Sequence, residues 1–370
     1  MIVKNEAVNL PGLFESIYPY IDFFVISDTG STDDTIQVIH KLATKYNLPG
    51  VVESHYWVDF ATNRNIALNM ATELKRTGIH QCKWLMFIDA DEILVVKDKN
   101  WKNTLIEGNN YTWYKRTNGY LVKLNHLVSI KDKGWKWEGK IHGNLKNDFL
   151  KKNYIHLTGV SVNADLMFTG AKSAPFKNIY EKLGKDIELL ETELQQTSIK
   201  KSNVHRYFQL AGGYMGLKFY KEAAKNYNLI TGFSETIKDI KYQALTDLSW
   251  CYLNQKESFN NCINPLMNAI FLNPERKESY YYLANIYRQY GWFYFSKLIL
   301  EKANSIFIEE FDYYSLEIAI YEWMIKRDLA FIYFLLGQNE KSKLVINELL
   351  KNKSVPEKEI LFLKELLTKH

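Results

Sequence analysis

Three carboxylates follow a short apolar segment near residue 90. The segment reads KWLMFI over 83–88, and Asp89, Ala90, Asp91 and Glu92 come directly after it. Such a run is typical of a buried strand, and α/β folds bind ligands at the carboxyl ends of their strands. Two carboxylates so close repel each other unless a cation lies between them, and hard oxygen ligands favour Mg²⁺ or Mn²⁺. The pattern predicts a divalent-metal site that can bridge to phosphate oxygens, and the alternative is a solvated loop.

A second polar segment, DTGSTDDT over 28–35, follows the apolar run FFVIS at 23–27. Gly30 permits a close backbone approach, and the Ser, Thr and Asp side chains can cap the helix expected at 35–46. Asp28 lies at the tip of the strand, where its carboxylate can accept hydrogen bonds from a base or a ribose. The alternative is that these residues only build the turn between strand and helix.

Three further side chains are candidates for binding. Arg64 lies one turn into the helix expected at 60–76, where its guanidinium can hold a phosphate or a base carbonyl. The alternative for Arg64 is a surface side chain with its head in solvent. His142 and His156 are candidate metal ligands, although isolated histidines are more often structural.

The first half of the chain alternates between strand and helix. We expect strands and helices at 23–27, 35–46, 51–57, 60–76 and 83–88. This alternation is the signature of right-handed βαβ units on a mainly parallel sheet. Met1-Ile2-Val3 reads as the end of a first, short strand. The aromatic, β-rich residues 111–160 predict a mixed or antiparallel extension of the sheet.

From about residue 176 to the end the pattern is helical and repetitive. The residue spacing of tetratricopeptide (TPR) repeats fits three segments, which begin at Tyr207, Tyr280 and Leu329, and a degenerate copy lies around Cys262, Ala269 and Pro274. Small residues at fixed positions let the two helices of each hairpin approach closely. The alternative is a non-repetitive helical bundle.

Composition narrows the class of protein. Of the 370 residues 46% are hydrophobic and 24% are charged, and the formal net charge is +5. This balance excludes a disordered chain, fits two or three globular domains, and does not favour a nucleic-acid partner. Three cysteines without CxxC spacing indicate a reducing, cytoplasmic compartment. We expect neither a transmembrane span nor a signal peptide.

Together these motifs resemble family 2 glycosyltransferases, inverting enzymes with a GT-A fold, in the subgroup with C-terminal TPR repeats. The matching segments are MIVKNEAVNLPGLFESI, VISDTGSTDDT, FATNRNIAL, FIDADE and WKWEGKIHGNL, with IHLTGV a poorer match. The resemblance covers nearly the whole chain. It implies a Rossmann-like α/β domain of the nucleotide-diphospho-sugar transferase type at 1–160, a connecting segment and helix at 161–200, and all-α TPR-like repeats at 201–370.

The resemblance also implies roles for the candidate residues. Glu6, Asp28, Arg64 and Asp89 would bind a nucleotide sugar, for which a UDP-sugar is the first candidate. Mn²⁺ or Mg²⁺ would be held by Asp89, Asp91, His156 and, second to it, His142. The activity implied is hexosyl transfer to a protein, peptide or glycan acceptor by single displacement with inversion. A base removes the acceptor's proton, and the metal stabilises the departing diphosphate.

Two departures from the family pattern bear on this activity. The subgroup carries a Glu directly after the His of its Ile-His motif, a residue suited to act as catalytic base, where this chain has Gly143. Glu138 and Glu92 are the candidate replacements. The first strand is cut short at Met1, where the family has several preceding residues. Either change is expected to lower the activity or to alter the acceptor.

Two functions from different classes follow. One is an active, metal-dependent sugar transferase whose repeats dock the acceptor. The other is a catalytically degenerate transferase that serves as a protein-binding scaffold through its TPR-like repeats. A nucleotidyltransferase would need a Gly-rich phosphate loop with Lys or Arg, and residues 1–20 contain none.

Overall fold

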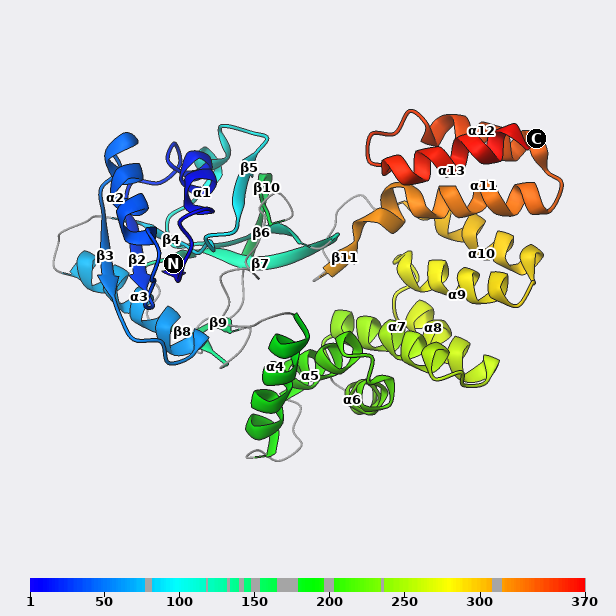
Figure 1. Ribbon diagram of the computed structural model, residues 1–370, viewed down its shortest axis with the longest axis horizontal. Coiled ribbons are helices and arrows are strands. Elements are labelled where there is room, and N and C mark those ends of the chain that lie inside the picture. The colour runs from blue at the N-terminus through cyan, green and yellow to red at the C-terminus, as the bar shows by residue number, and fades with distance from the viewer. Residues whose placement is uncertain are drawn as a thin grey trace. The chain divides into compact units, whose positions relative to one another are not determined.

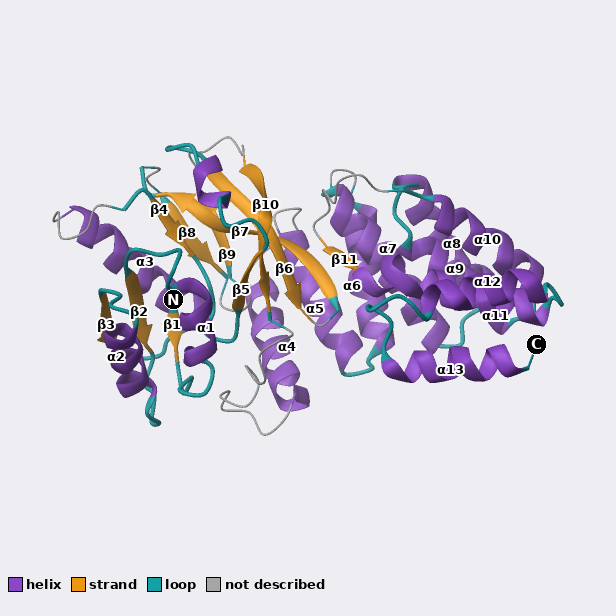
Figure 2. Ribbon diagram, turned by 90° about the horizontal axis from the view of Figure 1, so that it is seen from above, coloured by secondary structure: helices purple, strands orange, loops and turns teal. Residues whose placement is uncertain are grey.

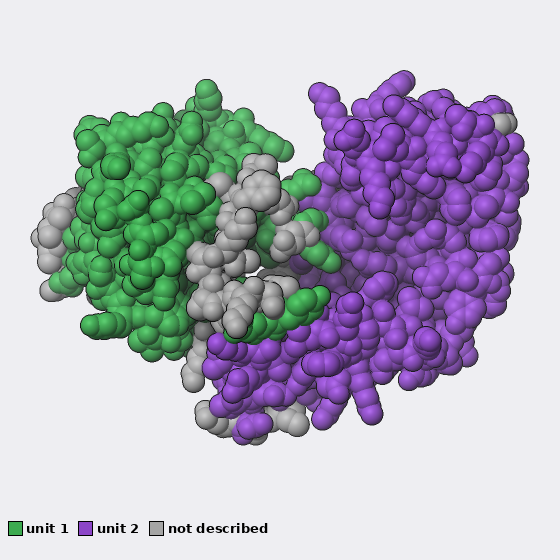
Figure 3. All heavy atoms as spheres, viewed as in Figure 1, with its two compact units in different colours: residues 1–182 green, residues 183–370 purple. Residues whose placement is uncertain are grey.

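The computed structural model describes residues 1–76, 82–117, 119–131, 134–139, 143–147, 154–164, 179–195, 203–233, 236–307 and 315–369. The chain divides into two compact units, unit 1 (Met1–Lys182) and unit 2 (Leu183–His370), coloured separately in Figure 3. The division falls inside the segment 161–200 that the sequence predicts as a connection. Within the described ranges, no helix combines the length and the apolar character that crossing a bilayer requires.

The first part of unit 1 alternates strands and helices, as predicted (Figure 1). Its elements are β1 (Ile2–Val3), α1 (Leu10–Ile17), β2 (Phe24–Asp28), α2 (Thr35–Lys45), β3 (Gly50–Ser54) and α3 (Phe60–Arg76). The strands form a parallel sheet in the order β1-β2-β3, with Val3 opposite Asp28 and Asp28 opposite Ser54. Because parallel strands end at one edge of their sheet, the polar segments after β1 and β2 meet there.

A second sheet in unit 1 holds the aromatic segments. Its strands are β4 (Trp84–Met86), β5 (Ile93–Val96), β6 (Asn110–Thr117), β7 (Tyr120–Ser129) and β10 (Tyr154–Asn163), and a 3₁₀ turn, η1 (Trp101–Thr104), lies between β5 and β6. The order is β7-β6-β10-β5, with β4 also on β7. β10 is parallel to β6 and antiparallel to β5, so the sheet is mixed, one of the two characters predicted. Among the described strands it is separate from the parallel sheet, however, and does not extend it as expected.

The pairing of β4 differs from the prediction. The segment 83–88 was expected as a third strand of the parallel sheet, but β4 pairs antiparallel with β7, and Trp84 lies opposite Ser129. The long strand β7 therefore pairs with both β6 and β4. A separate antiparallel hairpin consists of β8 (Trp135–Glu138) and β9 (Asn144–Asn147) (Figure 2).

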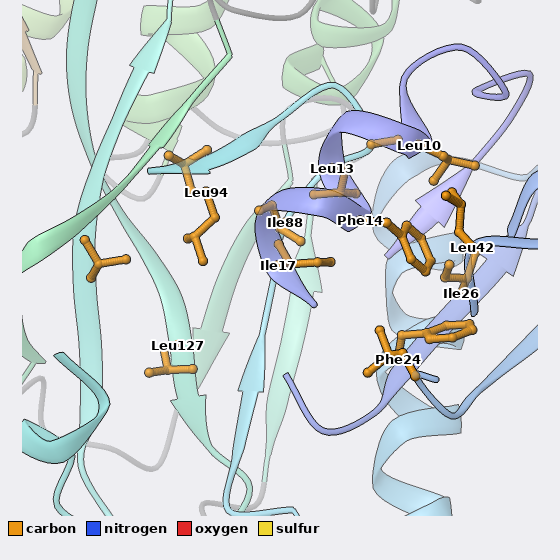
Figure 4. Packing of buried hydrophobic residues seen from close by; sticks show 14 of the residues in the cluster. Leu10, Leu13, Phe14, Ile17, Phe24, Ile26, Leu42, Ile88, Leu94 and Leu127 are labelled. Carbon is orange, nitrogen blue, oxygen red and sulfur yellow. The ribbon is translucent and has the colours of Figure 1, made fainter. Parts of the chain in front are cut away.

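One face of α1 forms the centre of the core of unit 1. The buried residues of this face, at helical spacing, are Leu10, Leu13, Phe14 and Ile17. Figure 4 shows them among side chains from both sheets, including Phe24, Ile26, Ile88, Leu94 and Leu127. Ile88 and Leu94 stand on either side of the carboxylate segment, so the core anchors that segment at both ends.

Unit 2 consists of helices that follow one another as hairpins (Figure 1). They are α4 (Ile179–Gln195, which begins just before the boundary), α5 (Val204–Gly216), α6 (Tyr220–Gly232), α7 (Lys238–Asn254), α8 (Phe259–Leu272), α9 (Glu278–Gln289), α10 (Phe293–Ser305), α11 (Ile325–Leu335), α12 (Asn339–Leu349) and α13 (Glu357–Thr368). A short strand, β11 (Ser315–Glu317), and a π-helical turn, η3 (Ile320–Met324), precede α11.

The small residues predicted at the helix crossings are buried there. Those of the three clear copies are Ala211, Ala223, Ala284, Ser296, Ala330 and Ser342. In the last copy, Ser342 Oγ donates to Ala330 O across the hairpin at 2.7 Å. Ser249 Oγ donates to Cys262 O at 2.6 Å between α7 and α8, so the degenerate copy is held in the same manner. The predicted repeat organisation is confirmed.

Asp247 in α7 gives unit 2 a pH-dependent stability. Burial raises the pKa of this carboxyl to about 7, although Gln243 Nε2 donates to Asp247 Oδ1 at 3.0 Å. The unfolded carboxyl titrates near pH ~3.9, so the folded chain holds the proton more tightly and loses stability as the pH rises from there through about 7. We expect Asp247→Asn to raise the melting temperature at about pH 8 and to leave it unchanged near pH 4. Equal shifts at both pH values would contradict this.

Candidate donor site

Asp89 and Asp91 lie in the turn between β4 and β5. Ile88, Ala90 and Glu92 are buried, whereas the two aspartates between them are partly exposed. Burial, and next to it the charge of Asp89, raises the pKa of Asp91. The structure therefore brings the two carboxylates together as predicted, in mutual repulsion that a bound cation would relieve.

Glu92 stabilises this turn through buried contacts of its side chain. Its carboxylate is almost fully buried and pairs with Lys115 of β6. The backbone N–H of Asp89 donates to Glu92 Oε2 at 2.9 Å. Burial, followed by the charge of Asp89, raises the pKa of Glu92 to about 7. This pKa suits a general base, but the inward position of the carboxylate suits a residue that holds Asp89 in place.

Arg64 reaches the same turn from α3. Its Nη2 lies 3.0 Å from Oδ1 and 3.1 Å from Oδ2 of Asp89. The guanidinium also stacks between aromatic rings, with its Cζ 4.7 Å from the ring centroid of Trp137 and 5.9 Å from that of Phe60. Its Nε and Nη1 make no hydrogen bond to any residue that the structure describes, so they can take a further anion such as a phosphate.

Asn65 and Trp137, which were not among the predicted site residues, complete this cluster. Asn65 Oδ1 accepts a hydrogen bond from the backbone N–H of Trp137 at 2.8 Å, and Asn65 Nδ2 donates to the backbone O of Trp137 at 2.9 Å. The Trp137 ring also meets Phe87 edge-on, with centroids 5.3 Å apart. The available signal was the place of Asn65 directly after Arg64, but its partner lies 72 residues further along the chain.

Asp28 is engaged within its own turn. Its Oδ2 accepts the N–H groups of Gly30 and Ser31, each at 3.1 Å, and its Oδ1 accepts Ser31 Oγ at 2.5 Å. Gly30 has φ +95°, a left-handed conformation that side chains disfavour. Asp28 is only 2% exposed. The contacts of Asp28 and Ser31 thus fit the alternative reading, in which these residues build the turn.

Glu6 belongs to the loop after β1, which is hydrogen-bonded to the turn after β2. Its N–H donates to Thr35 Oγ1 at 2.8 Å, and its Oε2 accepts Asn9 Nδ2 at 2.8 Å at the start of α1. The neighbouring Asn5 Oδ1 accepts the Thr32 N–H at 2.7 Å. The loops after β1 and β2 are therefore joined side by side at the carboxyl edge of the parallel sheet.

Glu138 lies on the opposite side of β8 from Trp137, because successive side chains of a strand alternate. Its carboxylate pairs with Lys136 Nζ and with Lys146 Nζ, each at 2.8 Å. These hydrogen bonds lower the pKa of Glu138 to about 2. A carboxylate with so low a pKa is a poor proton acceptor, so the structure gives this candidate base little support.

Of the two predicted histidine ligands the structure describes His156, which does not lie with the carboxylates. His156 lies opposite Thr112 near the start of β10, with Nδ1 3.3 Å from Thr112 Oγ1, and its ring packs on Tyr114. The carboxylate turn adjoins the other end of β10, where Asn163 pairs with Ile93. His142 lies outside the described residues. Within the described ranges no group of three or more His, Cys, Asp or Glu is placed to hold a metal ion.

Two carboxylates still fit a particular kind of metal site. Mg²⁺ and ions like it are often bound by one or two carboxylates together with substrate phosphates and water. Asp89 and Asp91 supply such hard oxygen ligands beside Arg64, which can engage the same phosphates. The donor set therefore suits a divalent ion that arrives with a diphosphate better than an all-protein metal cage.

Comparison with known proteins finds a glycosyltransferase family model and a TPR repeat-containing protein similar to parts of this chain. Residues 1–100 match the family model described as Glycosyl transferase family 2, in agreement with the resemblance of the motifs. A TPR repeat-containing protein of Synechococcus elongatus is 30% identical over 97 residues, which are 26% of this chain and 21% of that protein. The chain thus spans about a fifth of the length of this curated relative.

Solved structures similar to this chain are helical-repeat proteins. A crystal structure of MamA is 16% identical and covers 53% of this chain and 99% of its own, with a TM-score of 0.34. The C-terminal part of a TPR repeat-containing protein from Cytophaga hutchinsonii is 13% identical over 50% of this chain and 65% of its own, with a TM-score of 0.40. A thermophilic TPR protein from Thermus thermophilus is 15% identical and covers 50% of this chain and 93% of its own, with a TM-score of 0.37.

Proposed function

We propose that this chain, whose residues 1–100 carry a family 2 glycosyltransferase domain, is a metal-dependent hexosyltransferase that uses a UDP-sugar. The acceptor would be a protein, peptide or glycan docked on the TPR-like repeats. The observation that supports the proposal most is the cluster of Asp89, Asp91 and Arg64. It combines two carboxylates of the kind that bind metals with a guanidinium of which two nitrogens make no hydrogen bond to the described residues.

The roles proposed for these residues follow from their positions. Asp89 and Asp91 would hold Mn²⁺ or Mg²⁺ together with the donor's diphosphate oxygens, and Arg64 would bind the same diphosphate through Nε and Nη1. The bound metal supplies charge stabilisation for the departing diphosphate. Glu92 would keep Asp89 oriented through its backbone N–H. The acceptor oxygen would attack the anomeric carbon in one displacement, which breaks the bond from that carbon to the diphosphate and inverts the centre. The acceptor's proton would pass to a base, for which Glu138 and Glu92 are the candidates.

The repeats support the acceptor side of the proposal. Helical-hairpin repeats stack into extended surfaces that bind peptides, and unit 2 has this organisation from α5 to α12. A long acceptor bound there would be held close to the donor site by the chain itself, which raises its effective concentration.

Thermal unfolding with ligands tests the donor site. We would compare UDP, GDP, UDP-glucose and UDP-N-acetylglucosamine with and without Mn²⁺, on the wild type and on Asp91→Ala. The proposal expects stabilisation by several degrees that requires a uridine nucleotide, the metal and Asp91 together, because a ligand that binds only the folded state raises its stability. No stabilisation with any of these ligands would overturn it.

A second function, a protein-binding scaffold without transfer activity, is favoured by one pair of observations. Gly143 has no side chain to serve as base, and the carboxylate of Glu138 is held by two lysines. The scaffold predicts that a peptide or protein partner binds to the full chain while no UDP is released from any UDP-sugar. Release of UDP that depends on Asp91 would exclude it.

Gly143→Glu separates these two functions. A Cβ at position 143 would lie 3.5 Å from Gly139 O and 3.6 Å from both Glu138 O and Trp137 Cε3, which are ordinary contacts, so the backbone there accepts a β-carbon. If the transferase lacks only an efficient base, the added carboxylate should raise UDP release by about tenfold or more, since general bases contribute ~10²–10⁴-fold. Gly143→Gln, of equal size and without a base, is the control. Equal rates in the two variants would contradict the expectation.

A further inference from the structure

The β8–β9 hairpin depends on side chains for its position. Its two strands pair only with each other among the strands that the structure describes. The backbone of Trp137 is instead paired with the side chain of Asn65 on α3, through both its N–H and its carbonyl oxygen. One amide thus replaces the neighbouring strand that the outer edge of β8 would otherwise need.

The amide of Asn65 is well suited to this pair of bonds. The amide offers a donor and an acceptor side by side, so it can satisfy both backbone groups of one residue. An Asp side chain has the same shape but no donor, and its charge would face the Trp137 carbonyl oxygen. A serine would retain a single hydrogen-bonding group.

The two hydrogen bonds between the Asn65 amide and the Trp137 backbone, here called the clamp, determine where the Trp137 indole lies. With its backbone fixed by Asn65, the ring rests 4.7 Å from the Arg64 Cζ and meets the Phe87 ring edge-on. A cation over an aromatic face is attracted to it, and the interaction grows when water is excluded. Arg64 is thus held between the Trp137 ring and the Asp89 carboxylate, and only 20% of its side chain is exposed.

We propose that Asn65 is a positioning residue of the donor site, which places the Arg64 guanidinium through Trp137. Asn65 and Arg64 are consecutive on α3, so one helix turn directs one side chain to the hairpin and the other to Asp89. This inference rests on the proposed function for its consequence, which is donor affinity. The clamp itself is independent of that function.

Two readouts test the clamp and its consequence separately. Fluorine NMR of the chain labelled with 5-fluorotryptophan follows the Trp137 ring, whose signal among those of nine tryptophans is assigned with Trp137→Phe. In Asn65→Asp we expect this signal to move toward that of free 5-fluorotryptophan. Titration with UDP and Mn²⁺ should show affinity weakened by about tenfold to a hundredfold, the usual effect of losing a residue that orients a ligand-binding group.

Asn69→Asp is the matched control. Asn69 lies one turn further along α3 and is exposed, so the same chemical change there should move neither readout. If Asn65→Asp does not fold, Asn65→Ser, which keeps one hydrogen-bonding group, takes its place in both experiments.

The outcomes distinguish this inference from the proposed function. An unchanged Trp137 signal in the Asn65 variant overturns the clamp. A shifted signal with unchanged UDP affinity overturns the positioning role. A wild type that does not bind UDP overturns the proposed function and, with it, the role in donor binding, while the Trp137 signal still decides whether the clamp exists.

Discussion

Asp91→Asn should reduce sugar transfer by about a thousandfold while leaving the fold intact. The substitution keeps the shape of the side chain but removes one of two carboxylates proposed to bind the metal, and a metal's charge stabilisation of several kcal/mol corresponds to about that factor. The rate of UDP release from a UDP-sugar with Mn²⁺ measures the effect. A loss smaller than about tenfold would contradict a metal site at Asp91.

The stability of the same variant should change in the opposite direction. Asp91 is partly buried beside the Asp89 carboxylate, and this environment raises its pKa. A neutral amide removes the repulsion, so the melting temperature without ligand should rise, as is common when a site strained for function is relaxed. Asp22→Asn is the control, because Asp22 is exposed near the amino end of β2, and it should alter neither rate nor stability.

Local pattern was sufficient for most of the fold. The helix expected at 60–76 is α3 (Phe60–Arg76). It could be predicted because residues close in the sequence determine both its apolar spacing and its ends. The small residues that predicted the repeats, such as Ala211 and Ala330, are buried where the hairpins cross. The partner of β4 was predicted wrongly, since nothing in the segment 83–88 says that it pairs with β7, more than forty residues away.

The site residues likewise fall into those that a local sequence pattern predicted and those that depend on contacts between distant segments. Asp89 and Asp91 were found because an apolar strand followed by two carboxylates is a local pattern, and Arg64 because it begins a helix near the same edge. Trp137 was not found, since its contact with Asn65 spans 72 residues. Of the two lysines that lower the pKa of Glu138, Lys136 lies two residues away on the same strand. Lys146 was hidden, because only the pairing of β8 with β9 places it beside this carboxylate.

In unit 2 the largest expected effect on stability is that of Glu278→Ala. Arg276 and Glu278 are both almost fully buried, and Arg276 Nη2 donates to Glu278 Oε1 at 2.8 Å. Removing one partner of a buried ion pair leaves the other charge uncompensated and costs about 3–5 kcal/mol. The free energy of unfolding from urea denaturation measures the loss. A cost below about 1 kcal/mol would show that Asp239, which already lies 3.9 Å from Arg276 Nη1, compensates the charge of Arg276 in the variant.

The double variant Arg276→Met with Glu278→Leu separates the charge from the packing. Replacing both partners by apolar residues of similar volume is often neutral or stabilising, so most of the loss should be recovered. Two contacts limit the recovery. Arg276 Nη2 also donates to Ser315 O at 2.8 Å, and Tyr321 Oη donates to Glu278 Oε2 at 2.6 Å. Because these bonds join the first residue of α9 and the turn before it to the segment before α11, a shortfall in the double variant measures how strongly the ion pair couples successive repeats.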